Sequence, residues 1–148
     1  MDKLISLLDN NQVDFEIINH TKQINSAKEG AEYFGIDIGQ TAPTLILKTD
    51  KGYYSVIVSG NYGRVDLGAM KEILKVQEIR FAKPKEVEEA TGSRIGSVSL
   101  INPNLSTIID RELNRFSYVY GGTGKAESTL KISPKDLERL NNVIGYIR

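Results

Sequence analysis

The spacing of apolar residues predicts short helices and short strands along almost the whole chain. Leu4, Leu7 and Leu8 recur three and four positions apart, which is typical of one face of a helix. Apolar and polar residues alternate over 13–17, which predicts a strand with one buried face. The same two patterns predict further helices over 26–35, 66–74, 84–92 and 133–140, and further strands over 44–47, 53–58, 79–81, 107–109, 116–120 and 128–132.

Three connecting segments carry the signals of turns or loops. The sequence Thr-Asp-Lys-Gly over 49–52 joins two strands and predicts a hairpin. Gly121, Gly122 and Gly124 predict a flexible turn. Residues 92–106 are small and polar without helical periodicity, so they predict a long loop with a short strand. Long loops in compact domains are often functional, which makes this segment a candidate wall of a site.

The order of these elements predicts the fold class. Hairpins stand beside short helices, and the strands do not alternate strictly with helices. We therefore expect an α+β fold with a curved, largely antiparallel sheet and flanking helices, rather than a doubly wound parallel sheet. A length of 148 residues favours one domain over residues 1–148, because two domains would each have a weak core.

Composition excludes several kinds of chemistry. The chain has no cysteine and one histidine, which excludes disulfides, thiolate metal sites, cysteine nucleophiles and multi-histidine metal sites. Carboxylate-only sites for Mg²⁺ or Ca²⁺ stay open. With 19 basic and 19 acidic residues there is no basic surplus for DNA, although a local basic patch could contact RNA. The sequence has neither a signal-peptide pattern nor an apolar run of about 18 residues, so we expect a cytoplasmic protein with no membrane partner.

The glycine segments do not complete a phosphate-binding motif. Ala126 follows Gly124 and Lys125 where a P-loop needs serine or threonine, and Val119 stands where its first glycine belongs. The glycine N–H groups could still hold a carboxylate, a phosphate or an oxyanion, the alternative being an ordinary turn.

No side-chain constellation indicates a reaction. No serine lies in a Gly-x-Ser-x-Gly motif. The histidine, His20, either caps a loop or serves a site, and Asp66 and Asp110 either cap helices or act as acids. Spacing alone therefore names no reaction.

Several short motifs follow one another in a set order between Val13 and Leu140. They are a strand ending at His20, then 42–47, Gly60 with 64–67, 82–87, Thr91-Gly92, 95–99, 107–110, 118–122 and 130–137. In this order the chain resembles the YbaK-like family, also called the aminoacyl-tRNA deacylase or prolyl-tRNA synthetase editing-domain superfamily.

The resemblance implies a barrel-like sheet and a pocket for an aminoacyl ester. Such proteins hydrolyse mischarged aminoacyl-tRNA, and the substrate's terminal ribose hydroxyl is thought to assist. Water can attack a positioned ester if backbone N–H groups stabilise the oxyanion, so no protein nucleophile is required. The implied partners are the acceptor end of aminoacyl-tRNA and, as an option, an aminoacyl-tRNA synthetase. We expect no cofactor and no metal.

The resemblance also implies roles for individual residues. Gly96, Ser97 and Val98 would form the catalytic loop around the acyl group, with Gly121 and Gly122 as the opposite wall. The remaining substrate-binding candidates are His20 at the rim, Pro43, Lys48, Ser99 and Asp110, the last as a support of the pocket.

The chain departs from the family pattern at two positions. Pro43 stands where the family has lysine, and Lys48 should face the opposite side of the strand. Leu100 replaces the proline of the Gly-x-x-x-Pro loop. Three hypotheses follow: a hydrolase acting as a deacylase, a small-molecule or tRNA-binding module that has lost the lysine, and an accessory protein that docks on a synthetase with a vestigial pocket.

Overall fold

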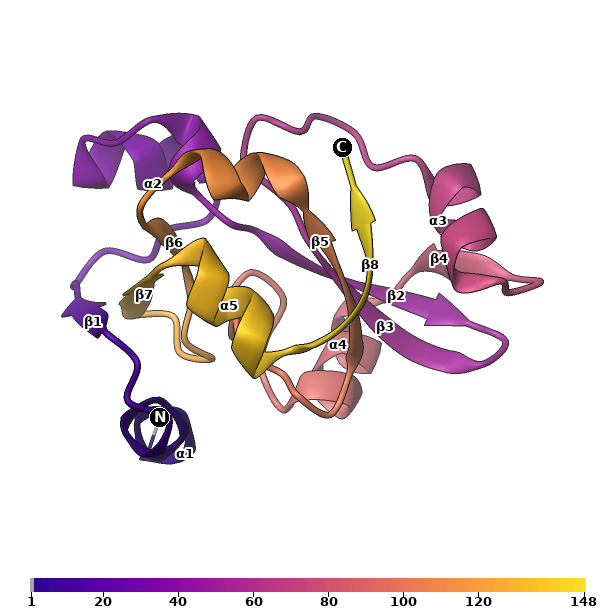
Figure 1. Ribbon diagram of the computed structural model, residues 1–148, viewed down its shortest axis with the longest axis horizontal. Helices are drawn as coiled ribbons and strands as arrows, with labels where there is room; N and C mark the ends of the chain where they lie inside the picture. The colour runs from indigo at the N-terminus through magenta and orange to yellow at the C-terminus, as the bar shows by residue number, and fades with distance from the viewer. Residues whose placement is uncertain (1) are drawn as a thin grey trace.

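The computed structural model describes residues 2–148, in which short helices are interspersed with short strands (Figure 1). The helices are α1 (Asp2–Asn10), α2 (Ala27–Phe34), α3 (Leu67–Leu74), α4 (Pro84–Thr91) and α5 (Pro134–Leu140), with 3-10 helices η1 (Ile38–Gln40) and η2 (Arg111–Arg115). The strands are β1 (Phe15–Asn19), β2 (Thr44–Thr49), β3 (Gly52–Ile57), β4 (Ile79–Phe81), β5 (Ser106–Asp110), β6 (Val119–Gly122), β7 (Ser128–Ile132) and β8 (Asn142–Ile147).

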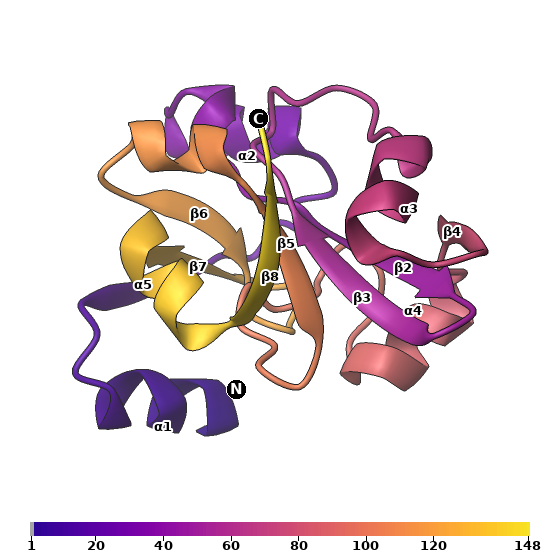
Figure 2. The ribbon, with the colours of Figure 1, turned by 45° about the vertical axis from the view of Figure 1, so that its right-hand side comes forward.

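The strands form two sheets that lie next to each other (Figure 2). The smaller sheet has the order β1-β7-β6 and is antiparallel. The larger has the order β4-β2-β3-β5-β8, in which β4, β2 and β3 are antiparallel while β5 and β8 run parallel to β3. A bridge between Thr41 and Tyr120 links the two sheets just before β2 begins.

Local side chains explain where the helices begin. Ser26 accepts a hydrogen bond from the Glu29 N–H at 3.1 Å, and Ser133 accepts one from the Asp136 N–H at 3.2 Å. Asp66 accepts from the first N–H groups of α3, so its role is that of a helix cap. These caps satisfy N–H groups that a helix leaves without partners, and the helices expected from the sequence are confirmed.

The core consists of three neighbouring groups of buried residues. The largest includes Leu8 of α1, Leu130 of β7 and Leu137 of α5, so it fills the space between the smaller sheet and these helices. A second group packs α3 on the larger sheet, and a third packs α4 on it through Val87. Val98 of the long loop belongs to the third group, which anchors that loop to the larger sheet.

The α+β fold class is confirmed, and four of the six strand ladders are antiparallel. The expectation of a barrel is corrected: the sheet is not closed, because the strands divide into two sheets. Gly121 and Gly122 lie in β6 and pair with β7, so the predicted turn there begins later. Residues 92–105 contain no strand, and they form one long loop.

Strand β8 is not predicted by the apolar pattern. It forms because its backbone pairs with β5, from Ser106 opposite Asn142 to Asp110 opposite Ile147. Gly145 allows this pairing beside α3, since a Cβ there would lie 3.0 Å from the Ile73 side chain. Within residues 2–148, none of the helices has the length and apolar character needed to cross a bilayer.

The burial of the smaller sheet predicts the cost of a cavity there. Leu130→Ala removes a fully buried side chain, so we expect a loss of about 2–5 kcal/mol in the free energy of unfolding, measured by urea denaturation. The matched control is Ile144→Ala on β8, where 47% of the residue is exposed and the loss should stay below about 1 kcal/mol. Equal losses for both variants would contradict this account of the core.

Candidate functional site

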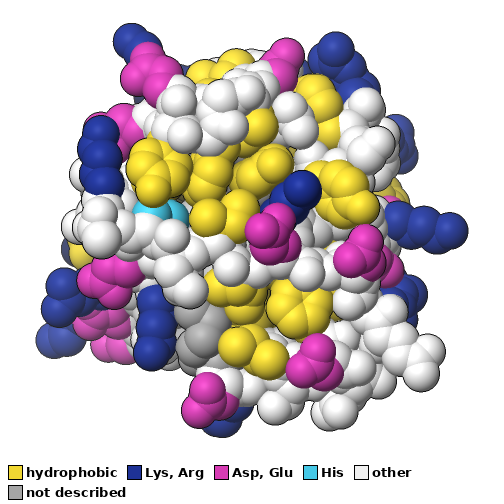
Figure 3. Space-filling model, turned by 90° about the vertical axis from the view of Figure 1, so that its left-hand side faces the viewer, with side chains coloured by type: hydrophobic (Ala, Val, Ile, Leu, Met, Phe, Trp, Pro, Cys, Tyr) yellow, Lys and Arg dark blue, Asp and Glu magenta, His cyan; other side chains and the backbone are white. Residues whose placement is uncertain are grey.

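A cavity of about 300 Å³ lies where α2, the start of β2, the long loop and the β6–β7 turn come together. Its size is at the lower end for small-molecule sites. His20, Pro43, Gly96, Ser97, Val98, Gly121 and Gly122 all line it, so the structure brings together seven of the ten residues singled out from the sequence. In Figure 3 the edge of the histidine is visible at the surface beside a group of hydrophobic side chains.

One wall of the cavity is the contact between the long loop and β6. A Cβ at Gly122 would lie 2.0 Å from the Val98 carbonyl oxygen, and one at Gly121 would lie 2.5 Å from the Leu100 Cγ. The Leu100 N–H donates to the Gly122 carbonyl at 3.0 Å. Gly122 therefore allows a close approach of two backbones, and Gly121 makes room for the Leu100 side chain. Both glycines lie against the loop, not in the opposite wall expected from the sequence.

The opposite wall is the segment between η1 and β2. The Ala42 N–H donates to the Tyr120 carbonyl at 2.8 Å, and the Val58 N–H donates to the Pro43 carbonyl at 3.0 Å. These bonds fix Pro43 between the two sheets. Pro43 lines the cavity, so no ammonium group enters the cavity at this position.

His20 lies buried at the cavity edge with both ring nitrogens engaged. Nδ1 is 2.6 Å from the Lys22 carbonyl oxygen, which can only accept, so Nδ1 carries a proton. In the neutral ring Nε2 then accepts from the Thr129 hydroxyl at 3.0 Å. His20 therefore both caps its loop and lines the cavity, which combines the two alternatives left open by the sequence.

The backbone N–H groups of the loop differ in availability. The Ser97 N–H donates to the Arg94 carbonyl at 3.0 Å, so it is already used. Among residues 2–148, no hydrogen-bond acceptor faces the N–H of Gly96 or Val98. Gly96 has φ of +87°, a conformation that favours glycine. Gly96 and Val98 are thus the donors that an anionic group in the cavity could use.

Lys48 and Ser99 lie outside the cavity lining. The Lys48 ammonium lies 4.7 Å from the centre of the Tyr53 ring, which pairs with it across β2 and β3. The Ser99 hydroxyl accepts from the Ile101 N–H at 3.1 Å. Neither side chain reaches the group of residues around His20 and Gly122, so both serve the surrounding structure instead.

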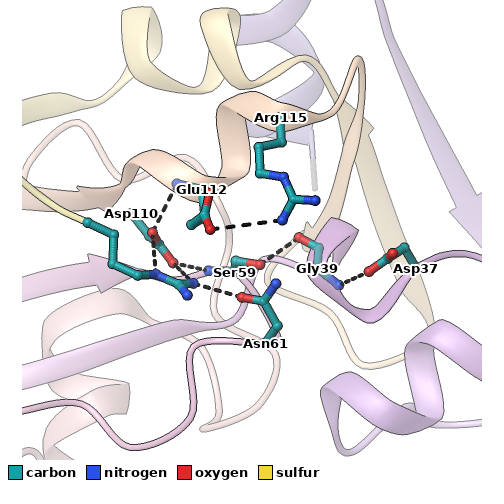
Figure 4. A network of polar contacts seen from close by, with 8 residues as sticks. Asp37, Gly39, Ser59, Asn61, Asp110, Glu112 and Arg115 are labelled. Carbon is teal, nitrogen blue, oxygen red and sulfur yellow. Dashed lines mark hydrogen bonds and ion pairs between the residues drawn. The ribbon is translucent and has the colours of Figure 1, made fainter.

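Asp110 also lies outside the cavity, fully buried at the end of β5 (Figure 4). It accepts from the Ser59 N–H at 2.9 Å and the Glu112 N–H at 3.0 Å, and it pairs with the Arg148 guanidinium at 2.7 Å. The hydrogen bond that the Arg148 guanidinium donates to Asp110 raises the pKa of Arg148 above its usual value. Asp110 therefore caps η2 and is the ion-pair partner of Arg148.

The Asp110 contacts extend toward the cavity wall. The Ser59 hydroxyl donates to the Gly39 carbonyl at 2.8 Å, and the Gly39 N–H donates to Asp37 at 2.8 Å (Figure 4). Residues 37–40 lead directly into Thr41, which lines the cavity. Asp110 therefore supports the wall indirectly, through β3 and η1.

Several lining residues carry no sequence signal of their own. The sequence pattern indicates ordinary packing positions in helices or sheets for Phe34, Tyr120 and Thr129. Tertiary structure brings them together at the cavity. Lys125 is the one fully charged side chain in the lining formed by the described residues. Within residues 2–148, no three His, Cys, Asp or Glu side chains gather in a way that could hold a metal ion.

Comparison with known proteins identifies relatives that share this fold. The sequence model of the aminoacyl-tRNA editing domain matches residues 21–140. The proline–tRNA ligase of Caldicellulosiruptor bescii is 25% identical over 112 residues, which are 76% of this chain and 19% of that protein. The ligase of Thermosipho melanesiensis is 27% identical over 121 residues, covering 80% of this chain and 21% of that protein. The chain therefore spans about a fifth of the length of these curated relatives.

Solved structures match over nearly the full chain. The crystal structure of the hypothetical protein APE2540 has a TM-score of 0.88 with 26% identity and covers 97% of both chains. A candidate trans-editing enzyme for prolyl tRNA synthetase has a TM-score of 0.83 with 27% identity, covering 97% of this chain and 92% of that one.

The glycine contact predicts which added methyl group the site can tolerate. Gly122→Ala places a Cβ against the Val98 carbonyl, so the loop must move, and we expect a loss of about 1–3 kcal/mol in the free energy of unfolding. Gly30→Ala is the matched control in the same lining, because its Cβ would meet nothing closer than 3.5 Å. Denaturant unfolding checks both, and an unchanged Gly122→Ala would contradict the close approach.

The Asp110 pair predicts a second stability effect. Arg148→Met leaves a buried carboxylate without its cation, and we expect a loss of about 2–4 kcal/mol in the free energy of unfolding. Arg115→Met removes an exposed pair with Glu112 at 3.9 Å and should cost less than about 1 kcal/mol. Thermal unfolding measures both, and similar small losses would show that Asp110 does not depend on its cation.

Proposed function

Because the chain belongs to the aminoacyl-tRNA editing domain family, we propose that it is a trans-editing deacylase, which hydrolyses the ester of mischarged aminoacyl-tRNA. The observation that supports this most is the meeting of Gly96 and Val98, with free N–H groups, and the β6 glycines at one cavity. We propose further that one domain over residues 1–148 carries the activity, and that it acts in the cytoplasm on tRNAs released by a synthetase.

The proposed reaction needs no nucleophilic side chain. A water oxygen attacks the ester carbonyl carbon, and the negative charge that develops on the carbonyl oxygen is stabilised by the N–H groups of Gly96 and Val98. The bond to the ribose oxygen then breaks, and the proton lost by water is taken up by that oxygen. The products are a free amino acid and tRNA with its terminal hydroxyl restored.

The cavity lining fits an uncharged acyl group. Apart from Lys125, its side chains are neutral, and many are small or apolar, including Ala27, Ala42 and Ile24. No carboxylate lines it, so a basic substrate side chain would lose hydration without gaining a charged partner. We propose that acyl groups with small neutral side chains are the preferred substrates.

The test is incubation of the purified protein with a panel of mischarged tRNAs, including Ala-, Ser- and Cys-tRNAPro. We expect faster loss of labelled amino acid than in buffer for at least one member of the panel. No loss above buffer across the whole panel would remove the hydrolase proposal.

The main alternative to water as the attacking nucleophile is the Thr129 hydroxyl, because it lies 3.0 Å from Nε2 of His20. Attack by water predicts that Thr129→Val keeps kcat within about tenfold, while loss of an attacking hydroxyl would cost more than about a thousandfold. Thr107→Val is the matched control, since Thr107 is a buried strand threonine away from the cavity.

A second candidate function is a binding module without turnover. The observation that favours it is Pro43, which stands in the lining where the family has a lysine. Saturable binding of aminoacyl-tRNA without hydrolysis, together with turnover gained by Pro43→Lys, would select this alternative over the deacylase.

A further inference from the structure

The proposed function determines what must lie at the mouth of the cavity. The acyl group of aminoacyl-tRNA is esterified to the ribose of the terminal adenosine. If the acyl group fills the cavity, the ribose, the base and the preceding phosphate lie just outside it. This placement rests on the proposed function, and it brings a nucleotide against the residues at the cavity mouth.

Aromatic rings lead from the surface into the cavity wall. Tyr33 is 48% exposed, and its ring lies 5.6 Å from that of His20 and 5.0 Å from that of Phe34. The Phe34 ring lies 5.2 Å from the Tyr120 ring. His20, Phe34 and Tyr120 line the cavity, so Tyr33 is the outermost ring of this group.

The outer side of Tyr33 is available for another ring. Its inner contacts with His20 and Phe34 hold the ring in place, so little further ordering is needed when a base stacks on it. Within residues 2–148 no hydrogen bond is made by its hydroxyl. Bases of single-stranded RNA stack on such exposed aromatic side chains whatever their sequence.

A positively charged residue lines the same cavity as His20. Lys125 is exposed and lines the cavity, and the turn that carries it is held by a bond from its N–H to the Thr123 hydroxyl at 3.1 Å. Two residues later, the Glu127 carbonyl accepts the His20 N–H at 2.9 Å. Among the described residues the Lys125 ammonium has no ion-pair partner within 4.0 Å.

We propose that Tyr33 and Lys125 form the subsite for the terminal nucleotide of tRNA, with the adenine stacked on Tyr33 and the preceding phosphate bound by Lys125. Every tRNA ends in the same nucleotides, so a stacking contact and one phosphate contact suffice for this end. Discrimination between substrates is then left to the acyl cavity. A chain with zero formal net charge needs such a local cation to attract RNA.

The first experiment measures binding of a short RNA, 5′-ACCA-3′, which has no ester and so does not depend on hydrolysis. Tyr33→Ala should raise Kd by about tenfold, while Tyr33→Phe should keep Kd near the unmodified value because the stacking face remains. Lys125→Ala should weaken binding and lower the slope of log K against log salt by about 0.7.

Tyr146→Ala is the matched control, because Tyr146 is 38% exposed on β8 and lies outside the cavity lining. We expect its Kd for the RNA to stay unchanged. The proposal is overturned if the protein does not bind the RNA, if Tyr33→Ala has no larger effect than Tyr146→Ala, or if Tyr33→Phe weakens binding as much as Tyr33→Ala.

The second experiment separates the nucleotide subsite from the acyl cavity. For a mischarged aminoacyl-tRNA that the protein deacylates, Tyr33→Ala should raise KM with little change in kcat, and hydrolysis of the methyl ester of the same amino acid should be unaffected. An equal loss of kcat/KM on the tRNA substrate and on the methyl ester would show a structural role for Tyr33 and overturn the subsite. RNA binding that depends on Tyr33, without any deacylation, would instead remove the proposed hydrolysis and leave the subsite standing.

Discussion

The candidate site depends on one close approach of two backbones. The long loop lies directly on β6 because Gly121 and Gly122 have no side chains to keep it away. Leu100 strengthens the contact in two ways, since its N–H bonds the Gly122 carbonyl and its fully buried side chain covers Gly121. Without this contact the N–H groups of the loop and the residues of β6 and β7 would not share a cavity.

The chemistry that such a cavity can support follows from the charges in its lining, where Lys125 is the one fully charged side chain among the described residues. Its interior has no carboxylate, and Pro43 stands where an ammonium group would be expected from the family pattern. Besides Lys125, which we assign to the tRNA phosphate, negative charge can be stabilised there by backbone dipoles, which are already oriented and need no reorganisation when charge develops. The hydrogen bond between Ser97 and Arg94 reduces the available donors, and Gly96 and Val98 carry the role in our proposal.

Local features of the fold could be predicted from the sequence, and long-range ones could not. The starts of three helices could be predicted from their cap residues, Ser26, Asp66 and Ser133. A cap side chain accepts hydrogen bonds from N–H groups only two or three residues later in the sequence. Strand β8 has no such signal, because its partner β5 lies about 36 residues earlier and decides its conformation. The bond between His20 and Thr129 joins residues 109 positions apart, so spacing could not reveal it.

The two departures from the family pattern have different consequences. Leu100 keeps an N–H that proline lacks, and this N–H makes the bond to Gly122, so a hydrogen bond fixes the loop where a proline ring would otherwise restrict φ. Pro43 has no such compensation, because the nearest lysine along the strand, Lys48, lies over Tyr53 and away from the cavity. The loop geometry is thus held by a hydrogen bond at position 100, whereas the proline ring at position 43 brings no charge into the cavity. The hydrolysis that we propose therefore draws on main-chain donors and on the substrate's own ribose hydroxyl.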